Sequence, residues 1–178
     1  MNPIEIIEKY YDKKSELYEI LIKHSSQVRD KALEVVQKHS ELGADSQFVA
    51  EAAMLHDIGI IFTNAPKIYC FGKHNYIEHG YLGSELLQQE GFLKHALVCE
   101  RHTGVGLSLD WIVRNKLPVP HRDMVPISIE EQIICYADKF FSKTNLNVCL
   151  PIEVIVKKLE KHEKSNSSLF LEWHNRFR

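Results

Sequence analysis

A histidine and an aspartate, His56 and Asp57, end an apolar helical run at residues 48–55. A helix of that composition is buried, so the pair that ends it comes to lie inside the protein. Burying an unpaired charge is strongly unfavourable, and the carboxylate is therefore expected to be paired, protonated or bound to a metal. Imidazole and carboxylate are ordinary ligands for zinc, iron, manganese and nickel. The pair predicts a metal centre to which other segments bring further ligands.

The size and composition of the chain limit its class. Its 178 residues are enough for one domain with a substantial core, and we expect a single domain over 1–178. A net charge of −2 provides no broad basic surface for nucleic acid, whereas 10 histidines are many for this length. The cysteines are scattered and form no Cys-x-x-Cys pair, which favours a reducing compartment. Neither a signal peptide nor a membrane span is expected, so we predict a cytoplasmic protein.

The spacing of apolar residues is helical almost throughout, which predicts an all-α helical bundle. No segment has a convincing strand pattern, and we expect loops at 60–76 and 117–126. Asp45 is a candidate N-cap for the helix that leads to His56, and Gly59 is expected to break that helix. Further along the chain, Ser128 to Glu131 has the form of a capping box. The expected helices cover about 3–21, 22–42, 45–58, 78–90, 92–101, 108–116, 128–141, 152–161 and 167–177.

Five helical segments carry a histidine or an aspartate on their apolar face. Residues three and four apart share one face of a helix, and this places His24 with Ile20 and Val28. The same relation holds for His56, His79, His102 and Asp138. A single inward histidine is usually a hydrogen-bonded core residue, and a single inward aspartate is usually a cap or an ion-pair partner. Five such segments together favour one shared metal site.

These segments, in this order, resemble the HD-domain superfamily of metal-dependent phosphohydrolases. The resemblance covers residues 24–144, with a motif-bearing core at about 22–144 and C-terminal helices at about 151–178. The matching motifs are His24-Ser25-Ser26-Gln27-Val28, Leu55-His56-Asp57-Ile58-Gly59, Glu78-His79-Gly80, Arg101-His102-Thr103 and Tyr136-Ala137-Asp138-Lys139.

The resemblance implies a binuclear centre with two divalent transition-metal ions, of iron, manganese, nickel, cobalt or zinc. By resemblance, His24 and Asp138 bind one metal, His79 and His102 bind the other, His56 binds one of the two, and Asp57 bridges them. The implied activity is that of a phosphohydrolase or phosphodiesterase, in which a metal-bridging hydroxide attacks phosphorus. The implied partner is a small nucleotide or another phosphorylated metabolite.

One position departs from the family pattern. Many relatives follow His-Asp-Ile-Gly with a lysine that contacts the substrate phosphate, but this chain has Ile60 there. Phosphate binding then falls to other cations, first Lys139, then Arg101, and less strongly Lys73 and Arg122. Each of these alone is more often a solvated charge.

The two long loops leave several roles open. We expect 60–76 and 104–126 to set specificity. His74 and His121 could act as general acids, or could be exposed loop histidines. Tyr69, Phe71 and Tyr76 could stack on a base, or could seal the loop onto the core.

Two other functions compete with hydrolysis. The first is a di-iron oxygenase, since a few HD-like proteins use the same ligand set to activate oxygen; it would require iron and consume oxygen. The second is a non-catalytic nucleotide-binding sensor, which the missing lysine at Ile60 leaves open. The complete ligand set argues against the sensor.

Overall fold

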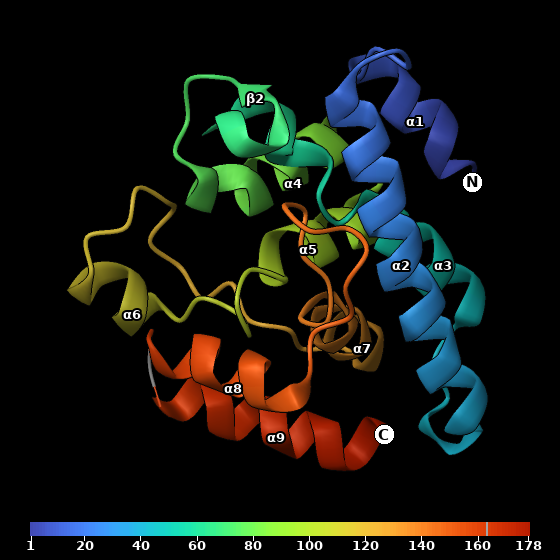
Figure 1. Ribbon diagram of the computed structural model, residues 1–178, viewed down its shortest axis with the longest axis vertical. Coiled ribbons are helices and arrows are strands. Elements are labelled where there is room, and N and C mark those ends of the chain that lie inside the picture. The colour runs from blue at the N-terminus through green and yellow to red at the C-terminus, as the bar shows by residue number, and fades with distance from the viewer. Residues whose placement is uncertain (163) are drawn as a thin grey trace.

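The fold, given by a computed structural model, confirms the all-α prediction (Figure 1). The structure describes residues 1–162 and 164–178. Its α-helices are α1 (Pro3–Tyr10), α2 (Glu16–Lys38), α3 (Ser46–Leu55), α4 (His79–Gln89), α5 (Leu93–Arg101), α6 (Leu109–Arg114), α7 (Ile129–Asp138), α8 (Ile152–Glu160) and α9 (Lys164–Phe177). The 3₁₀ turns are η1 (Ser40–Leu42), η2 (Ile58–Phe62), η3 (Pro66–Ile68) and η4 (Tyr76–Glu78).

A small sheet lies in the predicted loop at 60–76. Strand β1 (Asn64–Ala65) pairs antiparallel with β2 (Cys70–Phe71), and η3 connects them. Two-residue strands are too short to produce an alternating pattern, which explains why the sequence did not reveal them.

Side-chain caps define several helix starts. The Asp45 carboxylate accepts hydrogen bonds from the backbone of Gln47 and Phe48, which confirms it as the N-cap of α3. Ser128 caps α7 through Glu131 N. The Glu131 carboxylate accepts from Ile127 N, one residue before the cap, so the predicted capping box is only half formed.

The expected bounds of the first helices were wrong. The chain breaks at 11–15 rather than at 21, and Ser15 caps α2 through Tyr18 N. Tyr11, the first residue of the break, and Leu17, in the first turn of α2, are buried in the same apolar cluster, so the apolar spacing continues across the break. Helix α3 also ends earlier than expected, at Leu55, and Gly59 lies in η2.

Two large apolar clusters and a smaller one around Ile112 and Met124 form the core, and the long helix α2 contributes to both large clusters. One cluster gathers α1, the start of α2, η2, α4 and part of α5, around residues such as Leu21 and Leu55. The other gathers the rest of α2, α3, α7, α8 and α9, around Ile134, Tyr136 and Phe170. Helices α8 and α9 pack against each other, and α9 also packs on α7. None of the described helices combines the length and the apolar character that a bilayer span requires.

Candidate metal centre and adjoining cavity

The six predicted ligand side chains are buried and come together in the interior of the protein. They belong to five segments: His24 to the middle of α2, His56 and Asp57 to the residues after α3, His79 to the start of α4, His102 to the residue after α5, and Asp138 to the end of α7. The carboxyl ends of α3, α5 and α7 therefore meet here. Helix carboxyl ends carry partial negative charge, so their convergence favours a bound cation.

Asp57 lies at the centre of the cluster. Its Oδ2 atom is 3.1 Å from His24 Nε2 and 3.0 Å from His56 Nε2. Its Oδ1 atom is 3.4 Å from the Nε2 atoms of both His79 and His102. Asp138 Oδ1 is 3.0 Å from His24 Nε2 and joins the first group. The side chains form two groups that could each hold a metal ion, and Asp57 is common to both.

Hydrogen bonds to the backbone fix how three of the imidazole rings present their nitrogens. The Nδ1 atoms of His56, His79 and His102 lie 2.7, 2.6 and 2.7 Å from carbonyl oxygens three residues earlier in the chain. A carbonyl oxygen only accepts, so each Nδ1 donates, and Nε2 is the nitrogen that faces the centre. This arrangement of the outer nitrogen is typical of metal-ligating histidines.

The distance between His79 and His102 fits a metal ligand pair. Their Nε2 atoms are 3.0 Å apart. Burial, followed by the proximity of His102, lowers the pKa of His79 to about 3, and burial also lowers the pKa of His102. Both rings are therefore neutral, and two lone pairs point into the same small space. A cation bound by both nitrogens would remove that repulsion.

Unpaired polar atoms support the same interpretation. His56 Nε2 lies 3.0 Å from Asp57 Oδ2, and Asp57 Oδ1 lies 3.4 Å from two histidine Nε2 atoms. His56 Nε2 and Asp57 Oδ1 are nevertheless buried without a hydrogen bond to any described residue. Such atoms are rare in folded proteins and call for a ligand or another explanation. Burial opposes ionisation of Asp57, but Lys143 and His56 hold its pKa well below the usual value. The carboxylate is thus charged, as a metal ligand must be, and the donor set fits a transition-metal ion.

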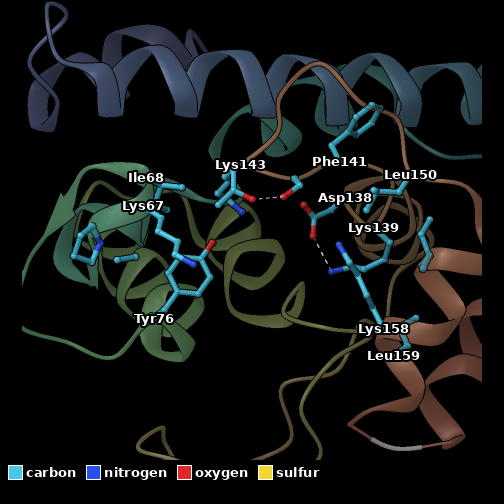
Figure 2. A pocket seen from close by; sticks show the side chains of 15 residues that line it. Lys67, Ile68, Tyr76, Asp138, Lys139, Phe141, Lys143, Leu150, Lys158 and Leu159 are labelled. Carbon is cyan, nitrogen blue, oxygen red and sulfur yellow. Dashed lines mark hydrogen bonds and ion pairs between the residues drawn. The ribbon is translucent and has the colours of Figure 1, made fainter.

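A cavity of about 580 Å³ adjoins the centre, and Asp138 is part of its lining (Figure 2). Among the residues that the structure describes, four lysines and this one carboxylate are the charged groups that line it, although the whole chain has a net charge of −2. The lysines are Lys67 from η3, Lys139 and Lys143 after α7, and Lys158 from α8. The remaining lining is mainly apolar and includes Ile68, Tyr76, Phe141, Leu150, Ile155 and Leu159.

Lys143 is the residue of this region that sequence reasoning missed. Its Nζ is 2.6 Å from Asp57 Oδ2 and 5.9 Å from the centroid of the Tyr76 ring. Burial alone would lower the pKa of Lys143, but the charge of Asp57 outweighs it and raises the pKa. Lys143 follows α7 in a loop, where helical spacing no longer indicates direction. Its position five residues after Asp138 was the only available signal.

Among the predicted phosphate-binding cations, the structure brings only Lys139 to the cavity. Its Nζ donates to Asp138 Oδ2 at 2.7 Å and to His102 O at 3.1 Å. Arg101 instead pairs with Glu131, and Arg122 pairs with Glu100. Lys73 is exposed on its loop. None of these three lines the cavity, and their role in phosphate binding stays a prediction.

Of the two loops expected to set specificity, only 60–76 contributes described residues to the cavity. The 60–76 loop contributes Ala65 to Ile68 and Tyr76 to the cavity, and the Tyr76 ring stacks on His79 with 4.7 Å between centroids. No described residue of 104–126 lines it; residues 141–150 and α8 do so instead. The two loop histidines that could act as general acids do not line the cavity: His74 is exposed and pairs with Glu78, and His121 is exposed.

Comparison with known proteins agrees with this geometry. The HD domain family matches residues 21–142, a range that contains all six side chains of the centre. The chain belongs to the HD domain family. The resemblance predicted from its motifs is confirmed, and the all-α fold is the fold of that family.

Curated relatives of this HD domain protein differ in size. The uncharacterized protein MJ0778 of Methanocaldococcus jannaschii is 32% identical over 83% of this chain and 80% of its own length. The tRNA (cytidine(56)-2'-O)-methyltransferases of Picrophilus torridus and Thermoplasma volcanium are each 31% identical, over 70% and 68% of this chain. The chain spans only 32% of each methyltransferase. No solved structure matches.

Proposed function

We propose that this HD domain protein is a metal-dependent phosphohydrolase or phosphodiesterase that acts on a small nucleotide or another phosphorylated metabolite. One observation carries the proposal: a ligand set organised around Asp57 adjoins, through Asp138, a cavity lined by four lysines. A divalent metal beside a positively charged cavity is suited to an anionic phosphate ester.

The proposed cofactors are two divalent transition-metal ions, which would activate water and offset charge on the reacting phosphate. His24, His56 and Asp138 would hold one ion, His79 and His102 the other, and Asp57 would contact both. The backbone carbonyls that accept from the histidine Nδ1 atoms keep these rings oriented.

Lys143 would take the phosphate-binding role that Ile60 cannot fill. Ile60 is fully buried in the apolar cluster of α1 and α4, so its side chain contacts no substrate. Lys143 lines the cavity and is 2.6 Å from Asp57 Oδ2, and its ammonium group would contact a phosphate oxygen there. Lys139 is committed to Asp138 and His102 and contributes charge and positioning.

The apolar lining suits the remainder of such a substrate. Phe141, Leu150, Ile155 and Leu159 offer a surface for a nucleoside, and the cavity volume lies within the usual range for small-ligand sites. The partner proposed is therefore a small molecule. Because two relatives are named as tRNA methyltransferases, phosphorylated nucleotides derived from RNA belong in the substrate screen.

The proposal is tested by a metal count on protein purified without chelators, combined with phosphate release from a panel of nucleotides. We expect about two transition-metal ions per chain, and release that proceeds with manganese or cobalt in the absence of oxygen. Two irons, oxygen consumption and no phosphate release would indicate an oxygenase. Nucleotide binding without turnover under any metal would indicate a sensor.

A further inference from the structure

Lys143 belongs to a loop at residues 141–150, which lies between α7 and α8 and contains no helix. Leu150 N donates to Phe140 O at 2.8 Å, so the two ends of the loop are held together at its base. That bond closes the loop, but it does not fix where Lys143 lies relative to the metal centre. Other contacts must do so.

A half-buried amide of α2 holds the middle of this loop. Gln27 Nε2 donates to Leu146 O at 2.7 Å, and Figure 1 shows the loop running beside α2. Gln27 follows His24 by three residues, so the two side chains share a face of the helix. Helix α2 thus supplies a candidate metal ligand and also fastens the loop that carries Lys143.

The other end of the Gln27 amide has no partner. Its Oε1 atom is buried without a hydrogen bond to any described residue, and such atoms are costly. An apolar side chain of similar length would avoid this cost, so stability of the fold gives the amide little advantage. What the amide adds is the bond that it donates to the loop.

A second contact between α2 and the loop is exposed. Lys23 Nζ donates to Asn147 Oδ1 at 2.7 Å, where water competes for both groups. Of the two contacts, the bond from Gln27 is the better shielded.

Lys143 and His24 meet on the same carboxylate oxygen. Asp57 Oδ2 is 2.6 Å from Lys143 Nζ and 3.1 Å from His24 Nε2. A phosphate that takes up the Lys143 ammonium would weaken its contact with Asp57. The bond from Gln27 would then keep the loop in place, which lowers the entropic cost of holding the ammonium on the phosphate.

We propose that Gln27 is a positioning residue, which acts through Leu146 O to hold the 141–150 loop so that the Lys143 ammonium stays beside the metal centre. The inference rests on the proposed function, because it takes Lys143 as the group that binds phosphate. The family match ends at residue 142, so Lys143 and Leu146 lie outside it and Gln27 lies within it. The contact therefore joins the family part of the chain to a segment that follows it.

The test measures binding of inorganic phosphate to the full chain by calorimetry with manganese present. The variants are Gln27→Met, which removes the amide at similar length, Gln27→Glu, which keeps the shape but replaces the donor, Lys143→Met, and the combination of Gln27→Met with Lys143→Met. Gln37→Met is the matched control, since Gln37 is exposed on the same helix. Manganese titration, circular dichroism and phosphate release from nucleotides are measured on each protein.

We expect Gln27→Met and Gln27→Glu each to weaken phosphate binding about tenfold, as loss of one charge-assisted contact would, with manganese affinity unchanged. In the Lys143→Met background, Gln27→Met should cause no further weakening, because the ammonium that Gln27 positions is already gone. Gln37→Met should leave phosphate binding unchanged.

Several results would overturn the positioning role: unchanged phosphate affinity in both Gln27 variants, losses that add to that of Lys143→Met, a parallel loss of manganese affinity, loss of the fold in both variants, or no phosphate binding by the unsubstituted chain. The proposed function fails separately. Coupling between Gln27 and Lys143 in phosphate binding, with no phosphate release from any nucleotide, would refute hydrolysis and leave the positioning role standing.

Discussion

Asp57 has a different task on each of its oxygens. Oδ2 faces His24, His56 and Lys143, whereas Oδ1 faces His79 and His102. This division allows one carboxylate to serve two groups of ligands, and no other described residue of the centre is common to both groups.

The substitution Asp57→Ala tests that role. We expect metal content to fall and phosphate release to drop by about 100-fold or more, because both ligand groups lose their shared member. The helical circular dichroism should be retained. Asp110→Ala is the control, since that side chain is 81% exposed on α6. Full activity in Asp57→Ala would contradict the proposed chemistry.

Lys143 gives a second prediction at this scale. Replacing it by methionine keeps most of its length but removes the charge that lies 2.6 Å from Asp57 Oδ2. Metal affinity should stay the same or rise, because a competing cation has gone, while phosphate release falls about tenfold or more. Metal titration and steady-state kinetics measure the two effects. Lys14→Met, on an exposed turn, serves as the control. If Lys143→Met lost metal affinity in parallel with activity, the role of Lys143 would be purely structural.

At the scale of elements, sequence reasoning succeeded where helical spacing carries the information. It predicted that His24, His79 and Asp138 face inward, because each shares a face with buried apolar residues, and all three are buried. Their role as metal ligands stays a prediction. It missed the break at 11–15, since Tyr11 and Leu17 continue the apolar pattern across it. It also missed Lys143 and the wall from α8, because tertiary packing rather than local spacing places them.

The contact between η2 and α4 provides a prediction about an element. A Cβ atom on Gly59 would lie 2.2 Å from His79 O and 2.4 Å from Gly83 N, so Gly59→Ala must push α4 away. We expect a loss of about 1–3 kcal/mol in the free energy of unfolding, together with weaker metal binding through His79. Denaturant unfolding and metal titration measure the two effects.

Gly43→Ala is the comparison for this change. Gly43 has a φ of +65°, but a Cβ atom added there would have no neighbouring atom within 4 Å, so only backbone strain is expected. The free energy of unfolding of the Gly43→Ala variant should fall by about 1–2 kcal/mol, and its metal binding should be unaffected. Normal metal affinity in Gly59→Ala would show that the η2–α4 contact does not control the position of His79.

For the whole molecule, the centre joins five segments that lie far apart in the chain. A metal that binds only the folded state should stabilise all of them together. Manganese at about 1,000 times its dissociation constant should add about 4 kcal/mol, or about 10 °C in Tm for a chain of this size. Calcium, which prefers oxygen ligands, should have a much smaller effect. Differential scanning calorimetry measures this change in Tm. The Tm of Asp57→Ala should not change when manganese is added.

The position of α8 after the family match has a consequence for how such a protein can diversify. All six candidate ligands precede residue 139, whereas Ile155, Lys158 and Leu159 reach the cavity from α8. Under the proposed function, part of substrate recognition is encoded after the stretch that carries the reacting centre. Mutations in the later stretch can change which molecule is accepted while the reacting centre is inherited intact. The same separation makes these three positions suitable for a randomised library that seeks new substrates.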